Sequence, residues 1–99
     1  MNKELRQILT DAAYDFCNGY DYGFRGDYSG RGMFGRQCLG IVCEDPLDCI
    51  EEFHCYLLDN NLVDKSFRLP SKRTDNMGYK MIVYFPSITT EDLNWDNYD

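Results

Sequence analysis

Four cysteines and the only histidine of this 99-residue chain fall within eighteen residues, and Zn²⁺ prefers these side chains as ligands. The set consists of Cys38, Cys43, Cys49, His54 and Cys55. Structural zinc sites usually contain cysteine pairs roughly two to four residues apart, and this set contains no such pair. Cys43, Cys49 and His54 can converge around a turn at residues 44–46, and Cys38 joins them only through a bend in its strand. Two interpretations stay open: a structural zinc site, or buried thiols that fill the core.

Cys55 follows His54 directly, which suggests a nucleophile and its base. Neighbouring residues on a helix point about 100° apart, so the two side chains do not easily share a proton. His54 also lies on the apolar side of its predicted helix. We therefore expect no catalytic residue and no enzymatic activity.

A glycine- and arginine-rich stretch, residues 24–36, offers a different chemistry. Successive backbone amides in a glycine loop form a concavity that binds anions, and arginine adds charged hydrogen bonds to phosphate. The candidate anion-binding residues are Gly30, Gly32, Arg31 and Arg36, joined by Arg68 and Lys80 from the predicted sheet. Known phosphate loops lead from a strand into a helix, whereas this stretch leads into a strand. A structural turn is the alternative.

Acidic residues gather on one side of a helix predicted from Asp45 to residue 60. The candidate partner-binding residues are Asp48, Glu51, Glu52 and Asp59 on that helix, Tyr28 in the glycine-rich stretch, and Glu91 and Asp92 near the C-terminus. A formal net charge of −7 argues against direct binding to nucleic acid or to an anionic membrane, and favours a basic partner. Simple solubility is the alternative explanation for the acidic side.

The remaining composition indicates a cytoplasmic globular protein. The N-terminus lacks the pattern of a secretory signal, and the longest apolar run, residues 81–85, is too short to span a membrane. Five cysteines are an odd number, so we expect reduced thiols.

Apolar periodicity predicts an α+β fold. Helices are expected from Asn2 to Gly19 and from Asp45 to residue 60, a strand at 33–43, and a hairpin with arms 66–69 and 79–85. Residues 20–24 fit either a short edge strand or a loop. The expected single domain covers residues 1–86 and places two helices on one face of a three-stranded, mainly antiparallel sheet, in the order helix, strand, helix, strand, strand. An acidic tail, 87–99, follows it.

Alternation along these strands predicts which residues face away from the helices. The open sheet face would carry basic and aromatic side chains, namely Phe34, Arg36, Arg68, Lys80, Ile82 and Tyr84. The molecule would then be acidic on its helix layer and basic on the opposite side. A slip of one residue in any strand would reverse this assignment.

Residues 28–35, Tyr-Ser-Gly-Arg-Gly-Met-Phe-Gly, resemble a segment of small uncharacterised proteins from phages and mobile elements. The resemblance covers these eight residues and implies no residue roles. The short, acidic format is also similar to that of phage inhibitors of bacterial defence, including anti-CRISPR proteins. That similarity implies a protein that binds a host effector in the bacterial cytoplasm.

Two functional hypotheses follow. The first is a non-enzymatic inhibitor that docks its acidic surface on a host protein with a basic nucleic-acid-binding groove, such as a CRISPR effector. The second is a small module that captures a nucleotide signal or single-stranded RNA on the basic, aromatic sheet face. Neither hypothesis requires a cofactor.

Overall fold

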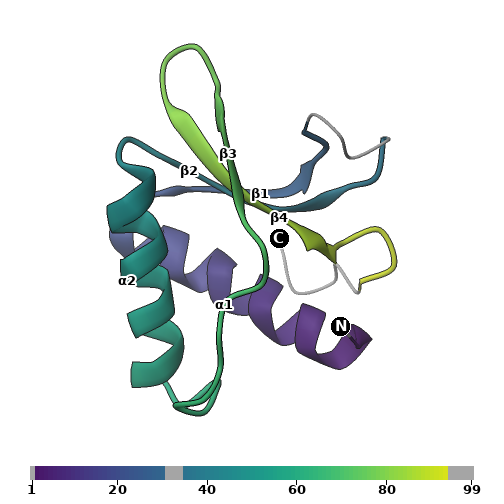
Figure 1. Ribbon diagram of the computed structural model, residues 1–99, viewed down its shortest axis with the longest axis vertical. Helices are drawn as coiled ribbons and strands as arrows, with labels where there is room; N and C mark the ends of the chain where they lie inside the picture. Colours follow the sequence, from purple (N-terminus) through teal and green to yellow (C-terminus); the bar gives the residue numbers. More distant parts are fainter. Residues whose placement is uncertain (1, 31–34, 94–99) are drawn as a thin grey trace.

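Two helices lie against one face of a four-stranded antiparallel sheet in the computed structural model, which describes residues 2–30 and 35–93 (Figure 1). In chain order the elements are α1 (Lys3–Tyr20), β1 (Gly23–Tyr28), β2 (Cys38–Cys43), α2 (Pro46–Asp59), β3 (Arg73–Asn76) and β4 (Met81–Thr89). The strands lie in the order β1-β2-β4-β3. The predicted α+β class is therefore confirmed, and the predicted number of three strands is wrong.

Both helices begin where the capping residues predicted. The Asn2 side chain accepts a hydrogen bond from the Leu5 amide at 2.7 Å, and Asp45 accepts one from the Leu47 amide at 3.1 Å. Pro46 occupies the first turn of α2, where its missing N–H costs nothing. At the other end of α1, Asp21 adopts a left-handed conformation with φ of 61° and turns the chain into β1.

β1 is the strand that the sequence analysis did not assign. It forms an edge of the sheet and pairs with β2, with Phe24 opposite Ile41. The register shifts between Arg25 and Tyr28, a bulge that a glycine-containing edge strand accommodates. The strand predicted at 33–43 begins only at Cys38, and residues 33 and 34 of that prediction lie outside the described residues.

The hairpin has a different first arm from the predicted one. Residues 66–69 belong to the irregular segment between α2 and β3, from which Phe67 and Leu69 pack against the core. The pairing arm is β3, which joins β4 through a tight turn. In this turn the Asn76 side chain accepts a hydrogen bond from the Gly78 amide at 2.7 Å, and Gly78 has φ of +95°.

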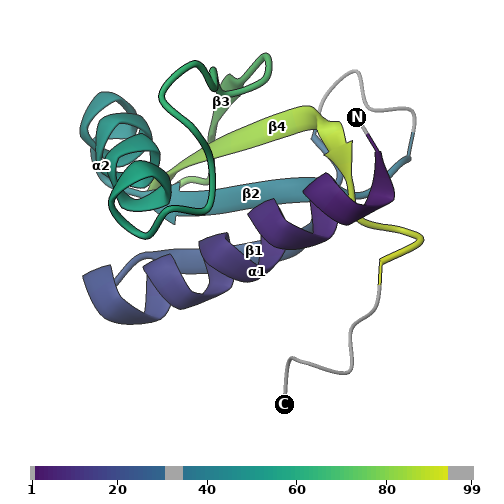
Figure 2. The same ribbon diagram turned by 90° about the horizontal axis from the view of Figure 1, so that it is seen from below.

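The core lies between the helices and the sheet, with a smaller apolar cluster on the other sheet face. Every residue of β2 is buried. Leu39, Ile41 and Cys43 face the helices, while Cys38 and Val42 pack with Ile82 and Tyr84 on the second face. Figure 2 shows α1 running along β1 and β2, with α2 at one end of the sheet.

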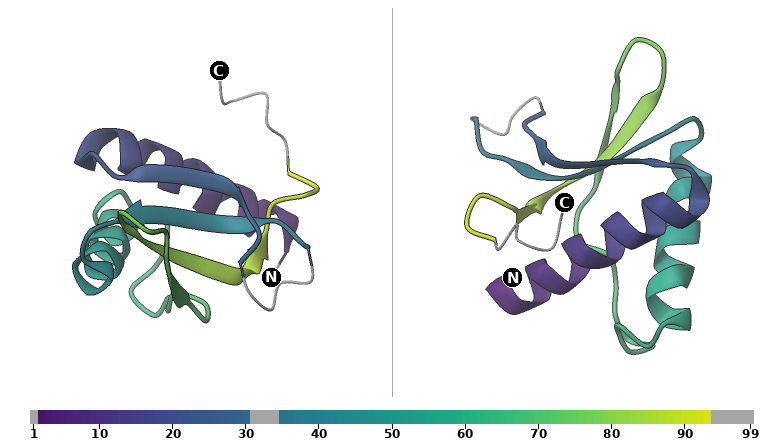
Figure 3. Two further views of the ribbon diagram at one scale, coloured as in Figure 1. Left: turned by 90° about the horizontal axis from the view of Figure 1, so that it is seen from above. Right: turned by 180° about the vertical axis from the view of Figure 1, so that it is seen from behind.

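The C-terminal part of the described chain is attached to the domain. β4 continues past Pro86 to Thr89, and Ile88 and Leu93 are buried, although a tail was predicted from residue 87. The Thr90 hydroxyl donates to the Gly26 carbonyl. Seen from behind, this end of β4 lies beside the first turns of α1 (Figure 3). Residues 94–99 of the predicted tail lie outside the described residues.

Arg6 joins α1 to the end of β4. Its guanidinium donates to the Thr89 carbonyl at 3.0 Å and hydroxyl at 2.6 Å, and it holds both carboxylate oxygens of Asp92 at 2.8 and 3.0 Å. The Arg6 side chain is only 12% exposed. A single side chain thus connects the two terminal segments of the domain.

We expect Arg6→Ala to lower the free energy of unfolding by about 2 kcal/mol, because it leaves partly buried acceptors of Thr89 without their donor. Urea denaturation followed by circular dichroism measures this loss. Lys3→Ala, an exposed site in the same helix, is the control and should change stability by less than about 0.5 kcal/mol. Equal stability of the two variants would contradict the assigned role of Arg6.

The Arg6–Asp92 pair also predicts an acid-dependent loss of stability. The hydrogen bond from Arg6 holds the pKa of Asp92 below its ordinary 3.8. A carboxyl whose pKa is lowered by folding stabilises the fold fully above its unfolded pKa, and this contribution disappears as the pH falls through the lowered folded pKa. Unfolding free energies of the wild type and Asp92→Asn should therefore differ at about pH 7 and converge toward about pH 2. A difference that stays constant over this range would refute the assignment.

Candidate partner-binding groove

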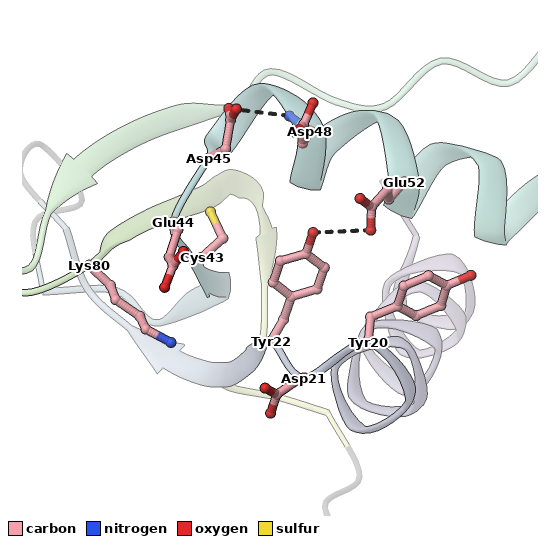
Figure 4. A pocket seen from close by; sticks show the side chains of 9 residues that line it. All are labelled: Tyr20, Asp21, Tyr22, Cys43, Glu44, Asp45, Asp48, Glu52 and Lys80. Atoms are coloured by element: carbon pink, nitrogen blue, oxygen red, sulfur yellow. Dashed lines mark hydrogen bonds between the residues drawn. The ribbon is translucent and has the colours of Figure 1, made fainter.

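A pocket of about 330 Å³ opens where the C-terminal end of α1 meets the first turns of α2. Its lining residues are Tyr20, Asp21, Tyr22, Cys43, Glu44, Asp45, Asp48, Glu52 and Lys80 (Figure 4). They come from the end of α1 and the turn after it, the end of β2 and the link to α2, the first turns of α2 and the β3–β4 turn. Segments that are distant in sequence therefore form one concave surface.

A second pocket of about 340 Å³ continues this surface along α2. It shares Tyr20, Asp48 and Glu52 with the first pocket and adds Glu51, Cys55, Tyr56 and Asp59. We call the residues that line the two pockets the acidic groove. Tyr20, Asp48 and Glu52 mark the place where the pockets meet.

Aromatic rings of the core pack against the tyrosines that line the groove. The fully buried ring of Phe16 lies 4.7 Å from Tyr20, 5.3 Å from Tyr22 and 5.5 Å from Tyr56 between ring centroids. Tyr22 also donates a hydrogen bond to Glu52 at 3.0 Å, and this bond is drawn in Figure 4. Because Phe16 also packs against Phe53 of α2, the same aromatic contacts fix the two helices relative to each other.

The groove has a strong excess of negative charge. Five carboxylates line the first pocket and two more line the second, whereas Lys80 is the one basic residue among these described lining residues. None of the seven carboxylates takes part in an ion pair within residues 2–30 and 35–93. Repulsion from Asp45, with smaller effects of partial burial, Glu52 and Glu51, raises the pKa of the exposed Asp48 above 3.8.

The structure brings together four of the residues proposed from sequence to bind a partner. Asp48, Glu51, Glu52 and Asp59 all line the groove. They lie on α2, which contains no lysine or arginine.

The other three proposed partner-binding residues lie elsewhere and have partners within the domain. Tyr28 donates to Asp75 at 2.6 Å on the second face of the sheet. Glu91 accepts from the Gln37 amide at 2.7 Å, and Asp92 pairs with Arg6. The first turns of α1, where Asp92 pairs, are at the opposite end of that helix from the groove (Figure 2).

Sequence reasoning missed the groove residues contributed by other elements, including Tyr20, Asp21, Tyr22 and Glu44. Residues 20–24 are aromatic, but nothing in their spacing links them to an acidic helix some thirty residues away. The available signal was the pair of tyrosines, Tyr20 and Tyr22, at a predicted helix end.

The proposed anion-binding residues are not gathered at one site. Lys80 lies in the β3–β4 turn and lines the acidic groove, and Arg68 lies in the segment after α2, where it donates to the Phe67 carbonyl at 3.1 Å. The prediction that both lie on the open sheet face is wrong, since neither is in a strand, whereas Ile82 and Tyr84 are on that face as predicted. Arg36 precedes β2 at the sheet end opposite to Lys80.

The glycine-rich stretch serves packing where it is described. A Cβ on Gly30 would lie 2.4 Å from the Tyr28 ring and 3.0 Å from the Tyr84 ring, so glycine is required for their contact. Arg31, Gly32 and Phe34 lie outside the described residues.

The proposed zinc ligands are separated by the sheet. Cys38 belongs to the cluster on the second face, whereas Cys43 and Cys49 are in the main core. Within the described ranges, no group of three or more histidine, cysteine or acidic side chains is arranged to hold a metal ion. Burial raises the pKa of Cys38 to about 11 and also raises the pKa of Cys43 and of Cys49, so these thiols are uncharged at neutral pH.

His54 and Cys55 point to different surroundings. The His54 ring lies 3.4 Å from the Phe67 carbonyl, whereas Cys55 is exposed and lines the second pocket of the groove. The geometry offers no pairing of the two for catalysis.

Neither helix of the described residues combines the length and the apolar character needed to cross a membrane. Comparison of the chain with protein-family models, curated proteins and solved structures found no match in any of the three.

We expect Asp45→Asn to lower the pKa of Asp48 toward 3.8, because it removes the largest source of repulsion while asparagine caps the helix as well as aspartate does. Carboxyl ¹³C NMR titration measures this pKa directly. Asp59→Asn, near the other end of α2, is the control and should leave the Asp48 titration unchanged. An unaltered Asp48 midpoint in Asp45→Asn would show that the groove charges do not interact as described.

Proposed function

We propose that this protein is a non-enzymatic inhibitor that binds a basic, nucleic-acid-binding surface of a host protein through the acidic groove. The main observation in support is that seven carboxylates line two adjoining pockets, and none of them forms an ion pair within the described residues. Lysine and arginine side chains that normally bind phosphates are also attracted by carboxylates. Occupation of such a surface blocks the access of nucleic acid.

The rigidity of the groove supports this function. Asp48 and Glu52 are one helical turn apart, about 6 Å along the axis of α2. The helix is held by buried Cys49, Phe53 and Leu57, so its carboxylates are presented on a fixed backbone. Groups ordered before binding lose less conformational entropy when they bind.

Unrelieved repulsion in the groove also favours binding over solubility as its role. Neighbouring carboxylates raise the pKa of Asp48, which means that the ionised form is disfavoured in the free protein. A basic partner removes this repulsion on binding. An acidic surface that served solubility would gain nothing from such close grouping.

The proposed binding surface contains fewer residues than the set considered from sequence. It keeps the four carboxylates of α2, namely Asp48, Glu51, Glu52 and Asp59. Tyr28, Glu91 and Asp92 are left out, because their side chains form hydrogen bonds or an ion pair with other residues of the domain. The separation of Arg36, Arg68 and Lys80 favours this function over the alternative of an anion-binding module. A CRISPR effector in the bacterial cytoplasm is the proposed host partner, in keeping with the short, acidic format of the chain.

The double charge reversal Asp48→Lys/Glu51→Lys tests the proposal. We expect it to weaken inhibition of nucleic-acid cleavage roughly tenfold or more, because it turns attraction to a basic surface into repulsion. The measurement is target cleavage by a panel of purified CRISPR effectors, titrated with wild-type and variant protein. Glu52 is left intact in this variant to preserve its bond with Tyr22.

Glu4→Lys/Asp27→Lys is the matched control. It also reverses one carboxylate in the first turn of a helix and one exposed carboxylate, so its change in net charge is the same. We expect this control to inhibit like the wild type. Equal inhibition by the groove variant and the wild type, with both proteins folded by circular dichroism, would reject the groove as the binding surface.

A further inference from the structure

Tyr20 stands at the junction of the two pockets of the acidic groove. It lines both pockets together with Asp48 and Glu52, and it is 51% exposed. Its ring packs on Phe16 at 4.7 Å and meets Tyr56 edge-on at 6.3 Å. An aromatic ring is thus fixed from the protein side and open on the solvent side.

The surroundings of Tyr20 select the charge of whatever covers it. Carboxylates flank the ring in both pockets, so an anionic group would be repelled. An apolar side chain would bury these carboxylates without a counter-charge, which is costly. A cation satisfies both the carboxylates and the electron-rich face of the ring.

Among cations, the geometry favours a planar one. A guanidinium group stacks on an aromatic ring and at the same time donates hydrogen bonds in its plane to carboxylates. An ammonium group is a compact, strongly hydrated point charge that forms no such stack. Tyr20 at the end of α1 and Glu52 on α2 both line the first pocket, and Figure 4 shows Glu52 also accepting the hydrogen bond from Tyr22.

We propose that the acidic groove recognises an arginine side chain of its basic partner, with the guanidinium on the Tyr20 ring and in hydrogen-bonding reach of Asp48 and Glu52. This inference rests on the proposed function and specifies the residue that anchors the partner. Lys80 does not occupy the position, because it lies across the first pocket from Tyr20 in Figure 4.

Two peptides of equal charge, nona-arginine and nona-lysine, test the inference by fluorescence anisotropy. We expect the wild type to bind nona-arginine about two- to fivefold more tightly than nona-lysine, because a guanidinium stacks on the ring while donating in its plane and a strongly hydrated ammonium does not. Tyr20→Leu should abolish this preference and leave nona-lysine affinity within about twofold. Tyr20→Phe should retain the preference, because the ring remains.

Tyr79→Leu provides the matched control. Tyr79 is 79% exposed and lies outside both pockets, so its replacement should leave the preference for arginine intact. Equal affinity of the wild type for the two peptides, or a preference that survives in Tyr20→Leu, would overturn the arginine anchor.

A measurement on the unmodified protein covers the case in which Tyr20→Leu fails to fold. The ring-proton NMR signals of Tyr20 should shift when nona-arginine is added, and unchanged signals at saturation would overturn the inference. Equal, carboxylate-dependent binding of both peptides overturns only the arginine anchor. Binding of neither peptide, or binding unaffected by Asp48→Lys/Glu51→Lys, contradicts the proposed function and the anchor together.

Discussion

Burial of β2 on both of its faces is the constraint on which the rest of the structure depends. All six residues of this strand are buried, and its side chains alternate between two apolar clusters. Leu39 and Ile41 require the helices on one side, and Cys38 and Val42 require cover on the other. Gly40 allows Tyr28 and Ile82 to approach the second side closely. This packing fills the centre of the second face, so the face does not offer the open basic surface expected from strand alternation. The acidic groove, where α1 meets α2, is therefore the better candidate for recognition.

The acidic groove depends on this core through Phe16. This ring packs against Phe53 and supports the tyrosines that line the groove. Packing of α1 and α2 around it supplies a rigid frame on which closely spaced carboxylates are held together despite their repulsion. The raised pKa of Asp48 is the electrostatic consequence of that placement. Nearby positive charge would relieve this repulsion.

Local signals predicted the helices well and the strands poorly. Asn2 and Asp45 begin α1 and α2 because a capping side chain acts on amides two or three residues away. The segment at residues 66–69 alternates like a strand, yet it packs Phe67 and Leu69 against the core without pairing. Residues 20–24 fit an edge strand or a loop, and the sequence does not decide for β1 because glycine interrupts the pattern and the pairing partner is unknown. A strand is defined by its neighbour in the sheet, and that neighbour is a long-range contact.

The sequence by itself determined that α2 begins at the Asp45 cap. It also determined that Asp48, Glu51, Glu52 and Asp59 lie on the outward side of this helix. Helix capping and the helical repeat both depend on residues only a few positions apart. Only the tertiary structure decided what joins them. In the folded domain, Tyr20, Tyr22 and Lys80 line the same groove as these carboxylates. Glu91 and Asp92 instead pair with Gln37 and Arg6. The reason is physical: a helix side follows from local geometry, whereas contacts between distant segments follow from how the helices and β4 pack around β2.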